Sequence, residues 1–346
     1  MTNDLKGKLV QCSSDVKPEQ QEYLWKPFLA KGTFGLLAGE AGVGKTTIAI
    51  DLAARLTTNA NWPDGTINIW TGGALLSASE DSFQKINKHR SHAAKVEHSK
   101  LYVVVSSFDP ITQTESLIKE LKVLVPERNI EFIIIDPLVD WVKGDLNKAN
   151  DVRNSIRKLV SFAEEFDVAI LGITHFAKVK EGVALIDRIL GSQAFSAYAR
   201  VVLIAAKDKN GDCYLGFAKN NYHRTDKVIK YSIEPCEVTY DGIEGSFETT
   251  KINWGDTHDY ISISDILGGK KISKPEQDLR KKCQQLIEFI GSEKRRSTEV
   301  EKWFIPNLGG ESTLKKVKKN ARIKSARVDG VWYYLPYSET EGSADY

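Results

Sequence analysis

Residues Gly39–Thr46 read Gly-Glu-Ala-Gly-Val-Gly-Lys-Thr, a complete G-x-x-x-x-G-K-[ST] loop. Glycines permit the positive φ angles at which main-chain N–H groups can close around a phosphate. The apolar run Thr33–Ala38 before the loop predicts a buried strand, and the apolar spacing of Thr47–Leu56 after it predicts a helix. This strand–loop–helix context favours a phosphate-binding loop over a glycine-rich turn that binds no nucleotide.

The loop predicts contacts with ATP and Mg²⁺. We expect Lys45 to reach the β- and γ-phosphates and to take part in catalysis, and the Thr46 hydroxyl to bind Mg²⁺. The residues expected to bind ATP are Gly39, Glu40, Ala41, Gly42, Val43, Gly44, Lys45, Thr46 and Thr47.

The composition is that of a globular protein larger than one typical domain. The chain has 346 residues, of which 41% are apolar and 27% are charged. No apolar run approaches the roughly 20 residues that a membrane span needs, and Met1–Lys6 lacks the apolar core of a secretory signal. We therefore expect a cytoplasmic protein with no membrane partner. The four scattered cysteines form no C-x-x-C pair, which favours unpaired thiols over a zinc site or a disulfide framework.

Strand and helix patterns alternate along most of the chain, which predicts an α/β fold with a mostly parallel sheet and helices on both faces. The strand candidates are Ile67–Trp70, Ala74–Ser79, Tyr102–Val105, Phe132–Ile135, Ala169–Ile173 and Arg200–Ile204, and the helical stretches include Leu117–Leu124 and Val152–Phe166. From Val201 to about Ile252 the pattern becomes β-rich and predicts short antiparallel strands that extend the sheet. Those strands are Cys213–Ala218, Lys227–Ile233, Val238–Tyr240 and Ser246–Ile252.

Two acidic positions follow predicted strands. Phe132–Pro137 is an apolar run that ends in Asp136, so a carboxylate is expected at the carboxyl edge of the sheet, where ligands bind. We expect Asp136 to bind Mg²⁺ opposite Thr46, although an aspartate can also simply end a strand. Leu75–Asp81 ends in Glu80 and Asp81, and a carboxylate beside the loop can serve as the general base for the attacking water.

In these features the chain resembles the RecA-like ATPases of the RepA hexameric replicative helicase type, which occur on plasmids, phages and integrated elements. The resemblance covers about residues 25–235. It is carried by Gly39–Thr46, Ser79–Asp81, Ile135–Leu138, Thr174–Lys178, Leu190–Ser192 through Arg200, and Lys219–Tyr222.

The resemblance implies a role for each matching position. Glu80 matches the catalytic glutamate, Asp136 the magnesium-binding aspartate, and His175 the residue that senses the γ-phosphate. Arg200 and Lys219 match basic residues that reach into the neighbouring subunit's site and act in catalysis there. A histidine satisfied at a strand end, and core or surface ion pairs for the two basic residues, remain open alternatives.

One position departs from the family pattern, which often has two adjacent histidines where this chain has Thr174 and His175. Lys178 and Lys180 follow in a stretch that the resemblance places in a DNA-binding loop facing a central channel. Solvated lysines on a loop would give the same pattern.

The C-terminal part has the outline of a basic winged-helix domain that binds DNA. Net charge of the whole chain is only +2, yet Arg280–Gly330 holds fourteen Lys and Arg against six Asp and Glu. Helices are predicted at Asp278–Phe289, Ser297–Phe304 and Ser312–Ala321, followed by a hairpin turning at Asp329-Gly330. The expected DNA-binding residues are Lys315, Lys316, Lys318, Lys319 and Arg322. A basic helix that packs on the ATPase or on a protein partner is the alternative.

The predicted organisation has five parts. These are a flexible N-terminal segment (1–24), a RecA-like ATPase domain (25–255), a linker (256–275), a winged-helix-like domain (276–337) and an acidic tail (338–346). The predicted function is that of a DNA-stimulated, Mg²⁺-dependent ATPase that forms a ring, expected to be a hexamer, and acts as a helicase or translocase in replication of a mobile element. A primase or initiator protein is a possible partner. A RecA-like recombination or loader ATPase and an ATP-switched DNA-binding regulator are the alternatives.

Overall fold

The structure is a computed structural model that describes residues 12–105, 107–145, 148–177, 185–189, 192–223, 227–259, 261–267, 274–291, 293–321 and 323–335. The chain divides into two compact units. The first is formed by Met1–Leu203 and Ile233–Asn253, and the second by Ile204–Ser232 and Trp254–Tyr346. Among the described residues, no helix combines the length and apolar character needed to cross a bilayer.

Within the described residues, nine strands form one sheet in the order β11-β10-β9-β8-β3-β7-β6-β4-β5. The strands that pair in parallel are β3 (Thr33–Gly39), β7 (Ala169–His175), β6 (Ile130–Asp136), β4 (Gly73–Ala78) and β5 (Leu101–Val103). The others are β8 (Val201–Lys207), β9 (Cys213–Asn220), β10 (Lys227–Tyr240) and β11 (Ile243–Asp259), and β9 and β10 pair antiparallel. The predicted α/β class with a mostly parallel sheet is therefore confirmed.

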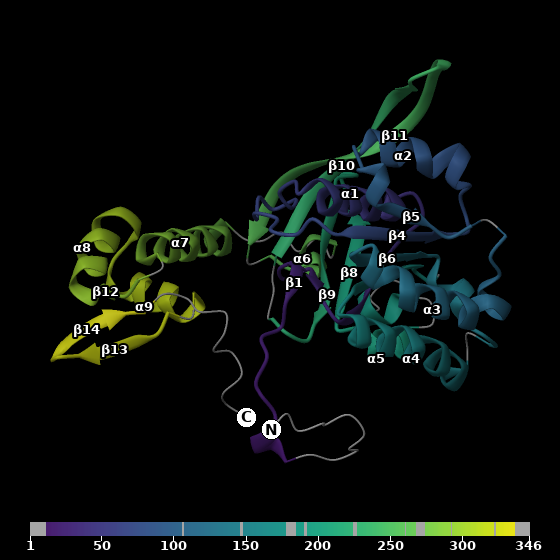
Figure 1. The fold of residues 1–346 in the computed structure, drawn as a ribbon. Coiled ribbons are helices and arrows are strands. Elements are labelled where there is room, and N and C mark those ends of the chain that lie inside the picture. Colours follow the sequence, from purple (N-terminus) through teal and green to yellow (C-terminus); the bar gives the residue numbers. More distant parts are fainter. Residues whose placement is uncertain are drawn as a thin grey trace. The chain divides into compact units, whose positions relative to one another are not determined.

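Helices cover both faces of the parallel strands. On one face lie α1 (Lys45–Thr58) and α2 (Lys88–Ala93), and on the other lie α3 (Pro110–Glu127), α4 (Ala149–Phe166) and α5 (Ser192–Tyr198) (Figure 1). Right-handed crossovers require this division, because the chain moves along the sheet from β3 to β5 and then returns through β6 and β7. Every residue of β6 is buried, as expected for a strand covered on both faces.

One predicted strand, Ile67–Trp70, is wrong. The segment is not a strand, and the side chains of Ile67 and Ile69 are 72% and 78% exposed. Side-chain amides hold it against the end of α1 instead: Asn59 Nδ2 donates to the carbonyl oxygen of Asn68 (2.7 Å), and Asn68 Nδ2 donates to that of Arg55 (2.8 Å). The alternating isoleucines that predict a strand thus face solvent.

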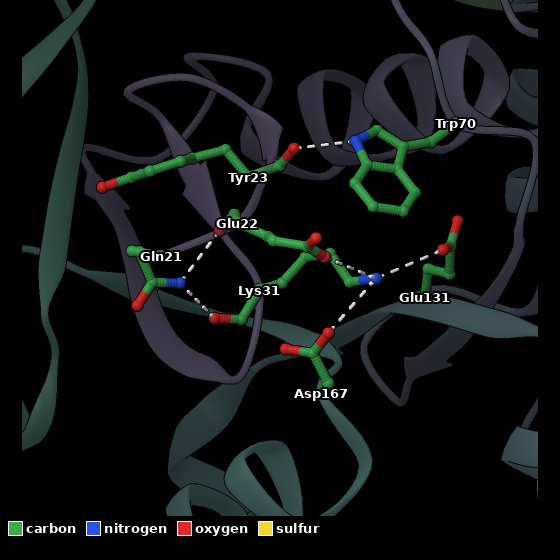
Figure 2. A network of polar contacts seen from close by, with 7 residues as sticks. All are labelled: Gln21, Glu22, Tyr23, Lys31, Trp70, Glu131 and Asp167. Atoms are coloured by element: carbon green, nitrogen blue, oxygen red, sulfur yellow. Dashed lines mark hydrogen bonds and ion pairs between the residues drawn. The ribbon is translucent and has the colours of Figure 1, made fainter. Parts of the chain in front are cut away.

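A buried lysine joins the N-terminal strands β1 (Tyr23–Trp25) and β2 (Leu29–Ala30) to the core (Figure 2). The Lys31 ammonium lies 3.4 Å from a carboxylate oxygen of Glu131, 3.3 Å from one of Asp167 and 3.8 Å from one of Glu22. It also lies 4.0 Å from the ring centroid of Trp70. Burial raises the pKa of Glu131, and the charge of Lys31 opposes that shift. The network therefore fixes the chain entering β3.

The long strand β10 runs through two of the predicted short strands, Lys227–Ile233 and Val238–Tyr240, and β11 extends beyond both ends of the predicted Ser246–Ile252. Their Ile233–Asn253 portion belongs to the first unit. There the rings of Tyr240 and Phe247 contact α2: His89 stacks on Phe247 (ring centroids 4.5 Å apart) and its Nδ1 lies 2.9 Å from the Tyr240 hydroxyl. The aromatic contacts hold α2 against these strands.

In the second unit, part of the expected linker 256–275 is ordered structure. Its first residues complete β11, and α6 (Ile263–Leu267) follows. Ile263 is fully buried and packs against Gly216 of β9, where an added Cβ atom would lie only 2.9 Å from the Cβ atom of Ile263. Residues 268–273 lie outside the described part of the chain, as do 1–11 of the expected flexible segment and the whole of the expected acidic tail.

The helices predicted near the C-terminus are present as α7 (Lys274–Ile290), α8 (Ser297–Leu308) and α9 (Glu311–Asn320). The apolar face of α7, which includes Cys283 and Leu286, packs with Val300 and Phe304 of α8 and Val317 of α9. Phe289 and Trp303 stack with ring centroids 4.0 Å apart. This part of the chain therefore has a hydrophobic core of its own.

The predicted hairpin is confirmed by β13 (Ser325–Val328) and β14 (Val331–Tyr334), which pair antiparallel. Asp329 and Gly330 at its turn have φ angles of 49° and 81°, the left-handed values that an Asp-Gly turn supplies. The short strand β12 (Arg295–Arg296) pairs with the other edge of β14.

Candidate active site

The loop Gly39–Thr46 joins β3 to α1. Gly42 and Gly44 have φ angles of 74° and 79°, which glycine adopts without strain. A Cβ atom at Gly44 would lie 2.8 Å from Cδ1 of Ile233 on β10, so a side chain is excluded there for steric reasons as well. Helix α1 begins directly after it, at Lys45. The loop therefore offers main-chain N–H groups and a helix N-terminus to an anion.

The register of the parallel strands brings the predicted residues to one edge. Gly39 at the end of β3 lies opposite His175 at the end of β7, and Ala78 at the end of β4 lies opposite Asp136 at the end of β6. A pocket of about 370 Å³ opens there. Besides the loop, it is lined by Glu80, Arg90, Asp136, His175, Ile233 and Thr250.

Lys45 is the buried cation of this pocket. Its ammonium donates to the carbonyl oxygens of Gly39 (3.1 Å) and Glu40 (2.7 Å) and lies 3.2 Å from His175 Nδ1. Burial lowers the pKa of Lys45, while Asp136 and Glu80 oppose the shift. An ammonium has no acceptor, so Nδ1 of His175 accepts and the proton of the neutral ring lies on Nε2.

The hydroxyl of Thr46 donates to Oδ2 of Asp136 over 2.6 Å. Burial raises the pKa of Asp136 to about 6, and the hydrogen bond from Thr46 and the charge of Lys45 oppose that shift. A buried carboxylate with this pKa lacks sufficient positive charge around it. A hydroxyl and a carboxylate at one point beside a phosphate-binding loop are also the protein oxygens that Mg²⁺ uses with nucleotides. The residues present therefore fit a Mg²⁺ ion.

Glu80 lies just beyond β4, with its side chain 56% exposed. Its Oε1 is 3.7 Å from Nε2 of His175. Burial and the nearby ammonium of Lys45 lower the pKa of His175, so the ring is neutral at pH 7. Glu80 thus has both solvent access and a neighbour whose N–H faces the pocket.

Three lining residues were not predicted. Ile233 and Thr250 come from β10 and β11, roughly 190 residues after the loop, and no local pattern connects them to it. Arg90 lies on α2, ten residues after Glu80, among other basic residues. The only sequence signal for Arg90 is its place in the chain order. It lies on the helix that follows the acidic residues at the end of a strand, and such a helix starts at the same edge of the sheet.

Two residues predicted to act in catalysis do not line this pocket. The main-chain N–H of Arg200 donates to the carbonyl oxygen of Phe34 (3.0 Å), at the start of β3, whereas the loop follows Gly39 at the other end of that strand. The Arg200 side chain is exposed. Lys219 lies near the end of β9 in the second unit.

The predicted DNA-binding residues fall into groups. Lys178, Lys180 and Arg322 lie outside the described residues. Lys315, Lys316 and Lys319 are exposed on α9. The same helix turns Leu314 and Val317 into the core, so these lysines lie on its outer side.

Lys318 differs from the other lysines of α9. Its ammonium lies 3.7 Å from the ring centroid of Tyr334 and donates to the Ser325 hydroxyl over 3.2 Å. Burial lowers the pKa of Lys318. The hydroxyl of Tyr334 in turn donates to Glu301 Oε1 (3.2 Å), and burial raises the pKa of Tyr334 to about 12. Lys318 therefore joins α9 to the hairpin.

Comparison with known proteins identifies a family and two relatives that this chain resembles. The model of a family described as an AAA domain matches residues 7–181, a range that contains the loop, Glu80, Asp136 and His175. Two curated relatives, from Chlamydia trachomatis serovar L2 and from Chlamydia trachomatis, are both described as "Probable plasmid replicative DNA helicase". Each is 23% identical over an alignment of 232 residues, and the match covers 59% of this chain and 51% of the relative. The chain therefore spans about half the length of the curated relatives it matches.

Proposed function

The chain belongs to the AAA domain family, and from that premise we propose that it is a Mg²⁺-dependent ATPase stimulated by DNA. The observation that carries the proposal is the convergence of Lys45, Thr46, Asp136, Glu80 and His175 on one pocket of about 370 Å³. Their separate elements, α1 and the ends of β4, β6 and β7, meet only because the strands are parallel and in register.

Each residue has a part in hydrolysis. The loop and Lys45 bind the phosphates. Thr46 and Asp136 would hold Mg²⁺, which would neutralise charge on the phosphate oxygens. Glu80 accepts a proton from the water whose oxygen attacks the γ-phosphorus. The bond from that phosphorus to the β–γ bridging oxygen breaks, which leaves ADP and inorganic phosphate.

His175 is proposed to sense the γ-phosphate through Nε2–H. The contact of Nδ1 with the Lys45 ammonium over 3.2 Å supports this role, because it leaves the proton on the nitrogen nearer Glu80. A hydrogen bond from His175 to the γ-phosphate can exist only before the phosphate is released. The end of β7 would therefore have one state with this hydrogen bond and another without it. The chain that follows β7, with Lys178 and Lys180, is proposed to bind DNA and to respond to those states.

Arg200 and Lys219 are proposed to complete the active site of a neighbouring copy. The position of Arg200 supports this, since its main chain lies at the edge of the sheet away from its own loop. A cation supplied by a neighbour can stabilise charge that develops on the transferred phosphoryl group. We therefore propose a ring, with six copies as the expected number.

The C-terminal elements α7–α9 and β12–β14 are proposed to form a winged-helix-like domain that binds DNA without sequence readout. Support comes from the exposed lysines of α9 and from the separate core beneath them. The matched relatives are named as probable plasmid replicative DNA helicases. We propose a related setting for this chain, as a helicase or translocase in replication of a plasmid, phage or integrated element. A primase or initiator protein is the proposed partner, in the cytoplasm.

Three measurements on the purified chain test this function. ATP hydrolysis should require Mg²⁺ and should rise when single-stranded DNA is added. A forked duplex should be unwound processively, and the mass with an ATP analogue and single-stranded DNA should be that of one closed ring. Absence of DNA stimulation at low and at physiological salt would refute translocation. A broad distribution of masses without unwinding would instead indicate a filament-forming or loader ATPase.

Removal of the α9 lysines should weaken DNA binding in a salt-dependent way. For a Lys315→Ala, Lys316→Ala, Lys319→Ala variant, the slope of log K against log salt should fall by about 2.7, because each lost phosphate contact removes roughly 0.9. Fluorescence anisotropy with duplex DNA at several salt concentrations measures it. The control removes the exposed lysines 17, 119 and 209, which changes net charge equally. Equal slopes for both variants would show that α9 is not the DNA-binding surface.

A further inference from the structure

Glu80 stands between two residues that are each held by hydrogen bonds. On one side, the Ser79 main-chain N–H donates to the carbonyl oxygen of Asp136 (3.0 Å), and its hydroxyl donates to Asp140 Oδ2 (2.6 Å). On the other side, Asp81 Oδ2 accepts from Arg90 Nη1 over 2.5 Å. The main chain on both sides of Glu80 is thereby fixed, although the Glu80 side chain itself is half exposed.

The guanidinium of Arg90 makes a second contact that strengthens this arrangement. Nη1 also donates to Asn87 Oδ1 (3.0 Å), and Nδ2 of Asn87 donates to the carbonyl oxygen of Asp81 (3.3 Å). Asn87 is fully buried, at the end of the π-helix Phe83–Asn87. Arg90, Asn87 and Asp81 therefore form a closed set of contacts between the start of α2 and the end of β4.

Helix α2 is in turn fixed from its other side. His89, next to Arg90, contacts Phe247 and Tyr240 of the long strands, and Ser91 is fully buried. These strands also supply Ile233, which lies against Gly44 of the loop. Arg90 thus projects from a helix that is held against the elements around the phosphate-binding loop.

We infer that Arg90 is a positioning residue, which through Asp81 and Asn87 holds Glu80 at the place where it can take a proton from the attacking water. The inference rests on the proposed function. A general base acts only within hydrogen-bond reach of its proton, and an error of about 1 Å can cost on the order of 100-fold in rate. Both hydrogen bonds come from the single nitrogen Nη1, whose N–H groups are fixed in the plane of the guanidinium, whereas the ammonium of a lysine rotates freely about its bond to the side chain.

The Arg90→Ala variant should therefore lose kcat and keep its affinity for nucleotide. We expect kcat to fall by about 100-fold, with KM and the Kd of a fluorescent ATP analogue within about twofold of the wild-type values. Arg90→Lys should lie between the two. An increase in Kd with unchanged kcat would overturn the inference, because it would mean that Arg90 binds the nucleotide directly. Arg55→Ala is the matched control: it breaks an Arg–Asp pair of 2.7 Å on α1 that does not line the pocket, and kcat should not change.

A double-mutant cycle separates positioning from a general structural role. In a Glu80→Gln background the base is already lost, so Arg90→Ala should lower the residual rate by less than about twofold. If the rate of the double variant instead falls by the product of the two single-variant losses, the two residues act independently and the inference is overturned. The charge-swapped variant with Asp81→Arg and Arg90→Asp should have a kcat at least about tenfold higher than that of Arg90→Ala. If its kcat is no higher, the ion pair between positions 81 and 90 does not position Glu80.

The failure of this inference can be told from the failure of the proposed function. If Glu80→Gln hydrolyses ATP at the wild-type rate, the proposed base is wrong whatever Arg90 does. If Glu80→Gln is inactive and Arg90→Ala keeps the wild-type kcat, the proposed function stands and the positioning role is refuted.

Discussion

Glu80→Gln should lower the steady-state rate of ATP hydrolysis by about 1,000-fold, within the range that loss of a general base produces. The substitution keeps the size and hydrogen-bonding capacity of the side chain but removes its ability to accept a proton. Nucleotide affinity should not change, because Lys45, Thr46 and Asp136 remain in place. Steady-state ATP hydrolysis and equilibrium binding of an ATP analogue measure the two quantities separately.

The control for this substitution is Glu127→Gln, an exposed glutamate at the end of α3 that does not line the pocket. It should hydrolyse ATP at the wild-type rate. Wild-type turnover by Glu80→Gln would place the base elsewhere. A loss of nucleotide affinity would show that Glu80 helps to bind ATP and does not act by activating the attacking water.

The central part of this site could be predicted because its residues are defined by local sequence. Gly39–Thr46 specifies its own backbone conformation, and an apolar run that ends in Asp136 specifies a buried strand with a carboxylate at its edge. Once the strands are taken as parallel, their carboxyl ends must share one edge, which brings Glu80 beside the loop. Local pattern and topology were sufficient for Asp136 and Glu80, whereas His175 was implied by the family resemblance.

Arg90 could not be predicted, because nothing in its local sequence separates it from Lys85 or Lys88. Its importance arises from the contact with Asp81 and from the aromatic rings of β10 and β11, which lie about 150 residues away in the chain. Lys318 is the opposite case, a residue that the local sequence pattern predicted to bind DNA but that packs inside its own domain. Its sequence context is that of Lys315, Lys316 and Lys319, but packing against Tyr334 gives it a structural role.

The remaining error in the fold has a different physical cause. Ile67–Trp70 carries the apolar alternation of a strand, and its main chain is instead bound by the side-chain amides of Asn59 and Asn68. Side-chain to main-chain hydrogen bonds of this kind compete with sheet pairing and leave no periodic signal. The long β10, by contrast, runs through Pro235, a residue that is read as an interruption in a sequence pattern.

Lys31→Met should lower the free energy of unfolding of the first unit by about 3–5 kcal/mol at pH 8, the usual cost of removing one partner from a buried ion pair. Lys31 and Glu131 are each only 8% exposed, so the variant leaves the Glu131 carboxylate buried without its cation. Glu22 and Asp167 are more than half exposed and water can replace their contact with the ammonium (Figure 2). Urea unfolding followed by tryptophan fluorescence measures the change.

Replacing both partners should restore most of that stability. In a Lys31→Met, Glu131→Leu variant no charge is left in the buried site, and apolar side chains of similar volume often substitute for an ion pair at little cost. If the double variant is as unstable as Lys31→Met, the loss comes from packing around Trp70 and not from the uncompensated carboxylate.

The penalty of Lys31→Met should also depend on pH, and its sign follows from Glu131. Burial already raises the pKa of this carboxyl above its ordinary value of 4.5, and Lys31 is the first of the groups that oppose the shift. Without the ammonium the folded-state pKa rises further, so the folded variant binds more protons than the unfolded chain above pH 4.5, and stability falls as pH rises. Unfolding at pH 5.5 should therefore show a smaller difference from wild type than unfolding at pH 8. An equal difference at both values would mean that Glu131 remains solvated, and that the cost of losing Lys31 arises from its contacts with Trp70 and the exposed carboxylates.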